Sequence, residues 1–154
     1  MRSVSAYHGV KLKNDPSDAR GEFTRRCDTI EEAYEYMLAY AAQGLTGDAS
    51  SASGGQLREF LRRAAAALNG MGGLLVTVIE QQQLEPEARY REYAAVLDRD
   101  ARDSLAAIEL VLAQPSISSQ LVDNLNASIH LRALLTDLFL IDEILKTKNV
   151  SIDD

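Results

Sequence analysis

Two histidines and one cysteine are the residues of this chain best suited to nucleophilic chemistry: His8, His130 and Cys27. A histidine on the side of a helix can take up a phosphoryl group or a proton near neutral pH. His130 lies in the segment SIHLRALLTDL, with Arg132 two positions later. Cys27 would need a neighbouring base to react, and neither histidine is placed beside it by the sequence. His130 and Arg132 are therefore the candidate catalytic residues.

The segment around His130 resembles the phosphorylation site of histidine phosphotransfer domains, which carry a reactive histidine on one helix of an acidic four-helix bundle. In that family a basic residue follows the histidine by three positions and a glycine by four. Here Arg132 comes at plus two, Ala133 at plus three and the bulky Leu134 at plus four. The resemblance implies phosphotransfer in a two-component relay. The alternative is a structural histidine beside an apolar seam.

A glycine-rich segment, LNGMGGLLVTVIE at 68–80, suggests a phosphate-binding turn. A Walker-type turn follows a strand and ends in Gly-Lys-Ser/Thr, whereas Gly73 is followed by Leu74. A buried strand at 74–79 is a second alternative. Heptad spacing instead runs through the glycines without a change of phase, at Leu57, Leu61, Ala64, Leu68, Met71, Leu75, Val78 and Gln82. This spacing predicts one helix over about 55–83, and any bend should fall at 69–73.

Small residues form a line on the opposite face of that predicted helix: Ala66, Gly70, Gly73 and Thr77. Because small side chains let another backbone approach closely, this line is the predicted helix-packing or partner interface. A helix that is apolar or small on every side should also be buried on every side. The alternative to a partner is that other helices of the same chain cover the line.

The candidate residues lie on or next to four segments that have the apolar spacing of a helix. These segments are 29–44, 53–83, 86–114 and 118–148. Thr29 and Glu32 form a capping box for the first helix, Ser53 caps the second, Pro86 opens the third, and Ser118 or Ser119 caps the last. The sequence therefore predicts an all-α fold, an antiparallel up-and-down helical bundle of about four helices over 29–148. An irregular N-terminal arm at 1–28 precedes it, as a docked segment or a short strand.

Neither a metal nor a cofactor is expected. A di-iron site in a bundle draws on Glu-x-x-His pairs from two helices, and the residue three positions before His130 is Ala127. One cysteine cannot form a disulfide within the chain or a cysteine-based zinc site.

The net charge of −7 is concentrated in the second half of the chain. Residues 1–70 hold nine basic and nine acidic residues, whereas residues 71–154 hold seven and fourteen. An acidic surface repels phosphates, so no nucleic-acid partner is expected. No window is apolar enough for a membrane span, and the start of the chain has no apolar signal region. We therefore expect a cytoplasmic protein that does not bind membranes.

These features leave no catalytic set apart from His130. We expect a non-enzymatic adaptor, regulatory or scaffolding protein that acts through protein–protein contacts, with a protein partner of unknown identity, and that forms a homodimer. Histidine phosphotransfer through His130 is the alternative.

Overall fold

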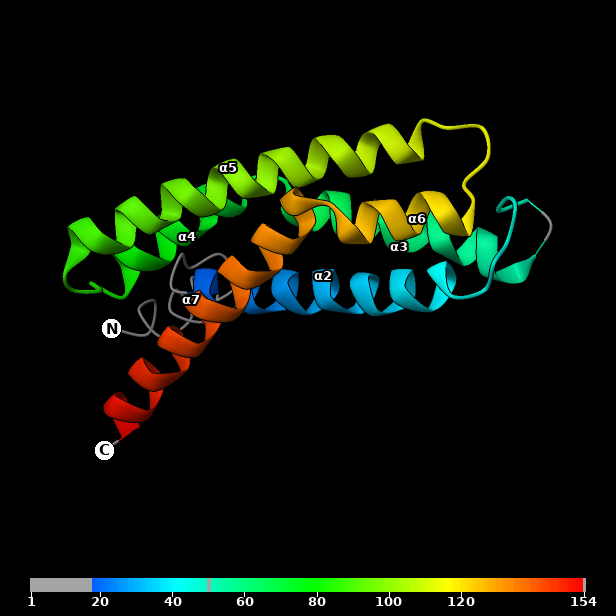
Figure 1. The fold of residues 1–154 in the computed structure, drawn as a ribbon. Coiled ribbons are helices and arrows are strands. Elements are labelled where there is room, and N and C mark those ends of the chain that lie inside the picture. Colours follow the sequence, from blue (N-terminus) through cyan, green and yellow to red (C-terminus); the bar gives the residue numbers. More distant parts are fainter. Residues whose placement is uncertain (1–17, 50, 154) are drawn as a thin grey trace, which may run out of the picture.

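The computed structural model describes residues 18–49 and 51–153, and these residues form six helices and no strand (Figure 1). The helices are α2 (Ala19–Ala41), α3 (Ala52–Leu68), α4 (Met71–Gln81), α5 (Glu87–Leu112), α6 (Ser119–Ala127) and α7 (Ile129–Asp153). The predicted all-α class is confirmed. The expected number of about four helices becomes six because two of the predicted helices are interrupted.

The first interruption lies between α3 and α4. Gly70 adopts a left-handed conformation with φ of 75°, and Asn69 before it is extended, with ψ of 117°. A continuous helix over 55–83 is therefore wrong, and the break falls inside the predicted interval. The heptad residues from Leu57 to Val78 are nevertheless all buried, so the apolar face keeps its phase across the break.

The second interruption is at Ser128, between α6 and α7. Ser128 is extended, with φ of −62° and ψ of 142°, and its hydroxyl accepts a hydrogen bond from the Leu131 N–H at 3.3 Å. A serine in this position caps a new helix. The predicted single helix over 118–148 is thus divided, although Ser118 caps its start as expected, accepting from the Leu121 N–H at 3.0 Å.

The first helix begins ten residues earlier than predicted, at Ala19 rather than Thr29. The Thr29 hydroxyl does not cap a helix and instead donates to the Arg25 carbonyl at 3.0 Å, one turn back inside α2. Phe23 and Cys27 are buried and extend the apolar stripe of the helix towards its N-terminus. Residues 19–28, expected in the N-terminal arm, therefore belong to α2. The rest of the predicted arm, with its alternatives of a docked segment or a short strand, lies outside the described residues.

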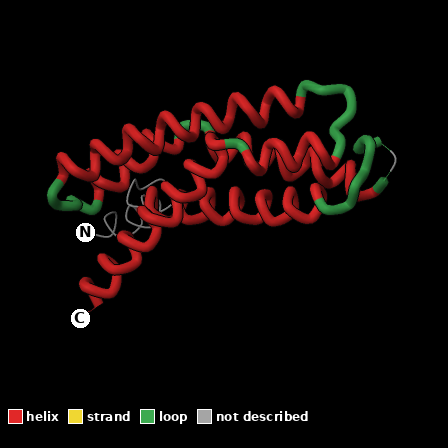
Figure 2. The backbone as a smooth tube through the Cα atoms, in the orientation of Figure 1, coloured by secondary structure: helices red, strands yellow, loops and turns green. Residues whose placement is uncertain are grey.

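Two helix starts differ by one or two residues from the sequence patterns. Ser51, not Ser53, caps α3, and its hydroxyl accepts from the Gly54 N–H at 3.2 Å. Pro86 occupies the N-cap position of α5, so the first helical residue is Glu87. The longer loops between the helices lie at the two ends of the fold, whereas the short breaks before α4 and α7 lie midway along it (Figure 2).

The helices enclose one apolar core. α2 packs against α3, α4 and α6, whereas α5 packs against α3, α4 and α7. The predicted seam of the last helix is buried at Leu131, Leu134, Leu138, Ile141 and Leu145. α7 runs at an angle to α2, and its last turns extend away from the other helices (Figure 1). Within the described chain, no helix has the length and apolar character needed to cross a membrane.

Candidate functional site

The predicted small-residue line lies on the surface. Ala66, Gly70 and Gly73 are exposed, and Thr77 is half-buried, with its hydroxyl donating to the Gly73 carbonyl at 3.2 Å. Nothing in the described chain lies within 4 Å of where a Cβ of Gly70 or Gly73 would stand. The expectation that this helix is buried on every side is therefore wrong. The small residues leave an open strip on α3 and α4, and none of the helices that the structure describes covers it.

The close helix contact is made instead by Gly72. A Cβ at Gly72 would lie 2.8 Å from the Asp98 Cα of α5, and Gly72 itself is buried. Since Gly72 follows the core residue Met71 directly, it lies at the border of the buried stripe. The heptad pattern could have shown this, because Gly72 is the glycine nearest to the apolar face.

His130 and Arg132 lie in the first turn of α7, and both side chains are exposed. The His130 side chain is 51% exposed, and its Nδ1 is 4.0 Å from Oδ2 of Asp103 on α5. The His130 carbonyl accepts a hydrogen bond from the buried Ser104 hydroxyl at 2.9 Å. Residues two apart on a helix do not share a face, so the two predicted residues do not form one site.

An apolar hollow of about 220 Å³ lies between α5 and α7. It is lined by Arg89, Tyr90, Tyr93, Leu140, Ile141 and Ile144. Leu140 is 51% exposed, and the adjacent Phe139 is 56% exposed. The run Leu138-Phe139-Leu140-Ile141 is the sequence signal for this surface, because four consecutive apolar residues on a helix cannot all face one core.

A carboxyl pair lies next to this hollow. Asp137 of α7 interacts with Asp100 of α5, and the Tyr93 hydroxyl donates to the Asp137 carbonyl at 2.9 Å. Burial, and then the neighbouring Asp100, raises the pKa of Asp137 to about 7. The same burial raises the pKa of Tyr93, with Asp137 and Asp100 adding to it. These two helices therefore meet at a carboxyl group, that of Asp137, which takes up and loses a proton near neutral pH.

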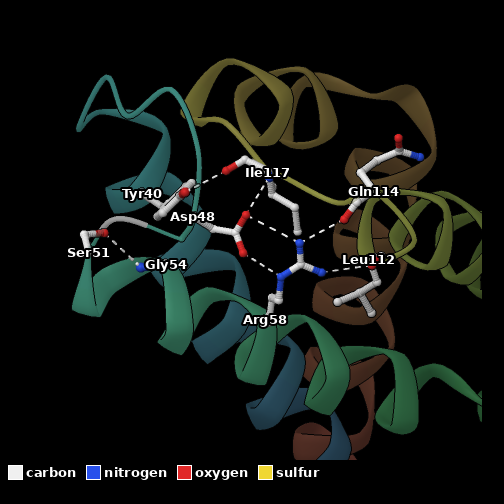
Figure 3. A network of polar contacts seen from close by, with 8 residues as sticks. All are labelled: Tyr40, Asp48, Ser51, Gly54, Arg58, Leu112, Gln114 and Ile117. Carbon is white, nitrogen blue, oxygen red and sulfur yellow. Dashed lines mark hydrogen bonds and ion pairs between the residues drawn. The ribbon is translucent and has the colours of Figure 1, made fainter.

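At the opposite end of the fold, a buried ion pair closes the loops (Figure 3). The Arg58 guanidinium of α3 pairs with Asp48, whose side chain is 8% exposed, and donates to the Leu112 and Gln114 carbonyls at 3.0 and 2.9 Å. The Ile117 N–H donates to Asp48 at 2.7 Å. These bonds lower the pKa of Asp48, the Arg58 contact contributing most. Each guanidinium nitrogen of Arg58 has an acceptor inside the protein, so the network is structural.

Two glycines make room for this network. A Cβ on Gly54 would overlap the Asp48 carbonyl, and one on Gly47 would overlap the Ser116 hydroxyl. The Tyr40 hydroxyl completes the closure by donating to the Ile117 carbonyl at 2.7 Å (Figure 3).

Potential metal ligands do not gather in the part of the chain that the structure describes: no group of three or more His, Cys, Asp or Glu side chains could hold an ion there. Cys27 is buried in α2, and burial raises the pKa of its thiol to about 12. The thiol is thus kept in its unreactive form.

The chain was compared with protein-family models, with curated proteins and with solved structures, and none of the three comparisons gave a match.

Proposed function

We propose that this protein is a non-enzymatic adaptor or scaffold, an up-and-down helical bundle that acts through protein–protein contacts as a homodimer. One observation carries the proposal: the apolar hollow between α5 and α7, beside the exposed side chains of Phe139 and Leu140. Grouped apolar side chains on a surface are typical of interaction sites. The proposal includes a cytoplasmic location, which fits a single buried thiol.

A second copy of the chain is the proposed occupant of this surface. In a two-fold dimer the same patch meets itself, so each α7 would place its Leu140 against the α5–α7 hollow of the other copy. Helices that dock in this way bury side chains spaced along one face, and Leu140 and Ile144, four positions apart on α7, supply that spacing. A stable interface needs about 800 Å² from each partner, which the hollow, Phe139 and the flanking turns would have to provide together.

The strip of Ala66, Gly70, Gly73 and Thr77 is the other candidate contact. Its openness supports close approach by a partner helix, since no part of the described chain lies within 4 Å of a Cβ at Gly70 or Gly73. We propose it as a second partner interface, and the two surfaces can be distinguished by mutation.

The test is the mass of the protein in solution, measured by light scattering over a range of concentrations. Leu140→Glu should convert a wild-type dimer to a monomer, because it puts a charge into the apolar contact. Leu110→Glu is the matched control: Leu110 is 66% exposed on α5, does not line the hollow, and its variant should remain dimeric. Gly73→Leu tests the small-residue strip. A monomeric wild type at all concentrations contradicts the homodimer.

Histidine phosphotransfer is a second candidate function, supported by the exposure of His130 and by Asp103 beside its Nδ1. A carboxylate at one ring nitrogen orients the imidazole and leaves the other nitrogen available for reaction. Incubation with a phosphorylated receiver domain should then label the wild type and not His130→Gln. Absence of label in the wild type, or equal label in the variant, contradicts this function.

A further inference from the structure

The contact between α5 and α7 contains a carboxyl group that lacks a counter-ion. Oδ2 of Asp137 is buried, and no group of the described chain donates a hydrogen bond to it. Oδ1 of the same carboxyl lies 3.5 Å from the Tyr93 hydroxyl, whose shorter bond at 2.9 Å goes to the Asp137 backbone carbonyl. A buried carboxylate oxygen without a donor is costly, and a proton on that oxygen removes the cost.

The neighbouring Asp100 carboxyl raises the pKa of Asp137, whereas the hydrogen bond from Tyr93 lowers it by a smaller amount. The two side chains of the described chain that act on Asp137 are Asp100 and Tyr93, both from α5. Arg132 and Asp137 both line a second surface hollow, formed by the end of α6 and the start of α7, but they form no ion pair in the described chain. The charged groups that α2 turns towards α7, Arg20 and Glu31, act on its later residues Asp142 and Lys146.

The contact with α5 is the main attachment of α7 to the rest of the fold. α7 is separated from α6 by the extended residue Ser128, and its helix contacts are with α5, α6 and α2. α5 makes the most extensive of these contacts, and Tyr93, Asp100 and Asp137 lie within it. A change at the carboxyl pair therefore acts on the main attachment of α7. The non-helical residue Ser128 joins this helix to α6.

We propose that Asp100 and Asp137 share one proton when α7 lies against α5, and that loss of this proton loosens α7 about Ser128, so that the contact is a pH-dependent latch. In the closed state, the protonated carboxyl donates to the other one. In the open state, both carboxylates are ionised and hydrated. Opening uncovers the apolar side chains between the two helices, among them Tyr93 and Ile141. This inference concerns the attachment of α7 within one chain and does not depend on the proposed dimer.

Hydrogen exchange of the whole chain, followed by mass spectrometry at pH 6 and pH 8, tests the latch. Labelling times are scaled for the intrinsic exchange rate, and peptides of α2 serve as the internal reference. Since the pKa of Asp137 is about 7 in the closed state and that of a free aspartate about 3.9, the opening of α7 should increase about tenfold between the two pH values. Exchange of α2 should not change.

Three variants decide the assignment. Asp137→Asn removes the carboxyl whose pKa is raised, so α7 should exchange equally at pH 6 and pH 8. Asp100→Asn removes only the second cause of the raised pKa and leaves burial, so the change should become smaller than tenfold without disappearing. His130→Gln is the control, because histidine ordinarily changes charge in this pH range and His130 lies at the start of the same helix; the tenfold change should persist in it.

The latch is overturned by any of three results: equal exchange of α7 at both pH values in the wild type, a pH dependence that survives in Asp137→Asn, or one that disappears in His130→Gln. The wild-type comparison stands even if a variant fails to fold.

Discussion

Asp48 and Arg58 join the loop after α2 to the segment that follows α5. The carboxylate comes from the loop and the guanidinium from α3, and Arg58 also donates to the Leu112 and Gln114 carbonyls at the end of α5. Three parts of the chain are thereby fixed at one point. Removing one partner of an enclosed ion pair leaves the other charge without compensation.

Arg58→Met should therefore lower the free energy of unfolding by about 3 kcal/mol, because it leaves the buried Asp48 carboxylate and two carbonyls without their donor. Urea denaturation followed by circular dichroism measures this. Arg63→Met is the control, since the Arg63–Glu59 pair is exposed on both sides, and it should cost less than about 1 kcal/mol. Equal losses in the two variants would mean that the network contributes nothing beyond a surface pair.

The adjacent glycines Gly72 and Gly73 should respond in opposite directions to alanine. Gly72→Ala places a Cβ 2.8 Å from the Asp98 Cα and should destabilise the protein by about 2 kcal/mol, because backbone must move. Gly73→Ala meets open space in a helix and should stabilise it by about 0.5–1 kcal/mol. The two midpoints of urea denaturation give the comparison. A stabilising Gly72→Ala would contradict the close packing of α4 on α5.

The sequence predicts the core of this fold well because burial depends on periodicity. From Leu57 to Val78 the buried positions follow the heptad spacing, even across the left-handed Gly70. The same property conceals the break, since a chain can change direction while it keeps its apolar face in phase. The start of α2 is missed for a different reason: a threonine and a glutamate three positions apart occur inside helices as well as at their ends, and tertiary burial of Phe23 decides the boundary.

The α5–α7 site could be predicted only in part. Four consecutive apolar residues around Phe139 indicate that one side chain must face outward. The pairing of Asp100 with Asp137 has no local signal, because the two residues come from different helices and meet only after α7 packs on α5. Small residues fit close contacts and therefore predict a buried face for the line from Ala66 to Thr77, but the same residues also leave a surface open.

Stability should depend on pH in two opposite ways. The pKa of Asp48 is lowered in the folded protein, so its contribution is present above the unfolded value and is lost as the pH falls through the lowered one. The pKa of Asp137 is raised to about 7, so the folded state binds more protons than the unfolded state between about pH 4 and pH 7. Its effect is a loss of stability as the pH rises through that window.

Asp137→Asn should remove the loss of stability that accompanies rising pH and leave the loss that accompanies falling pH, which comes from Asp48. At pH 8 the variant should be more stable than the wild type by about 1 kcal/mol, a value reduced for the partial exposure of the side chain. Urea denaturation at pH 5 and pH 8 measures the difference. Asp103→Asn, at an exposed position on α5, should leave the pH dependence as it is. A variant less stable than the wild type at pH 8 would show that the ionised carboxylate is well solvated.

The thiol of Cys27 should report on the opening of α2. Cys27 is 3% exposed, and burial, with added repulsion from Asp142, Glu31 and Asp28, raises its pKa to about 12. At pH 8 almost none of it is thiolate, the form that reacts with disulfide reagents. The native protein should therefore react with such a reagent far more slowly than the same chain in concentrated urea. Reaction of the folded protein at the rate of the unfolded chain would contradict the burial of this face of α2.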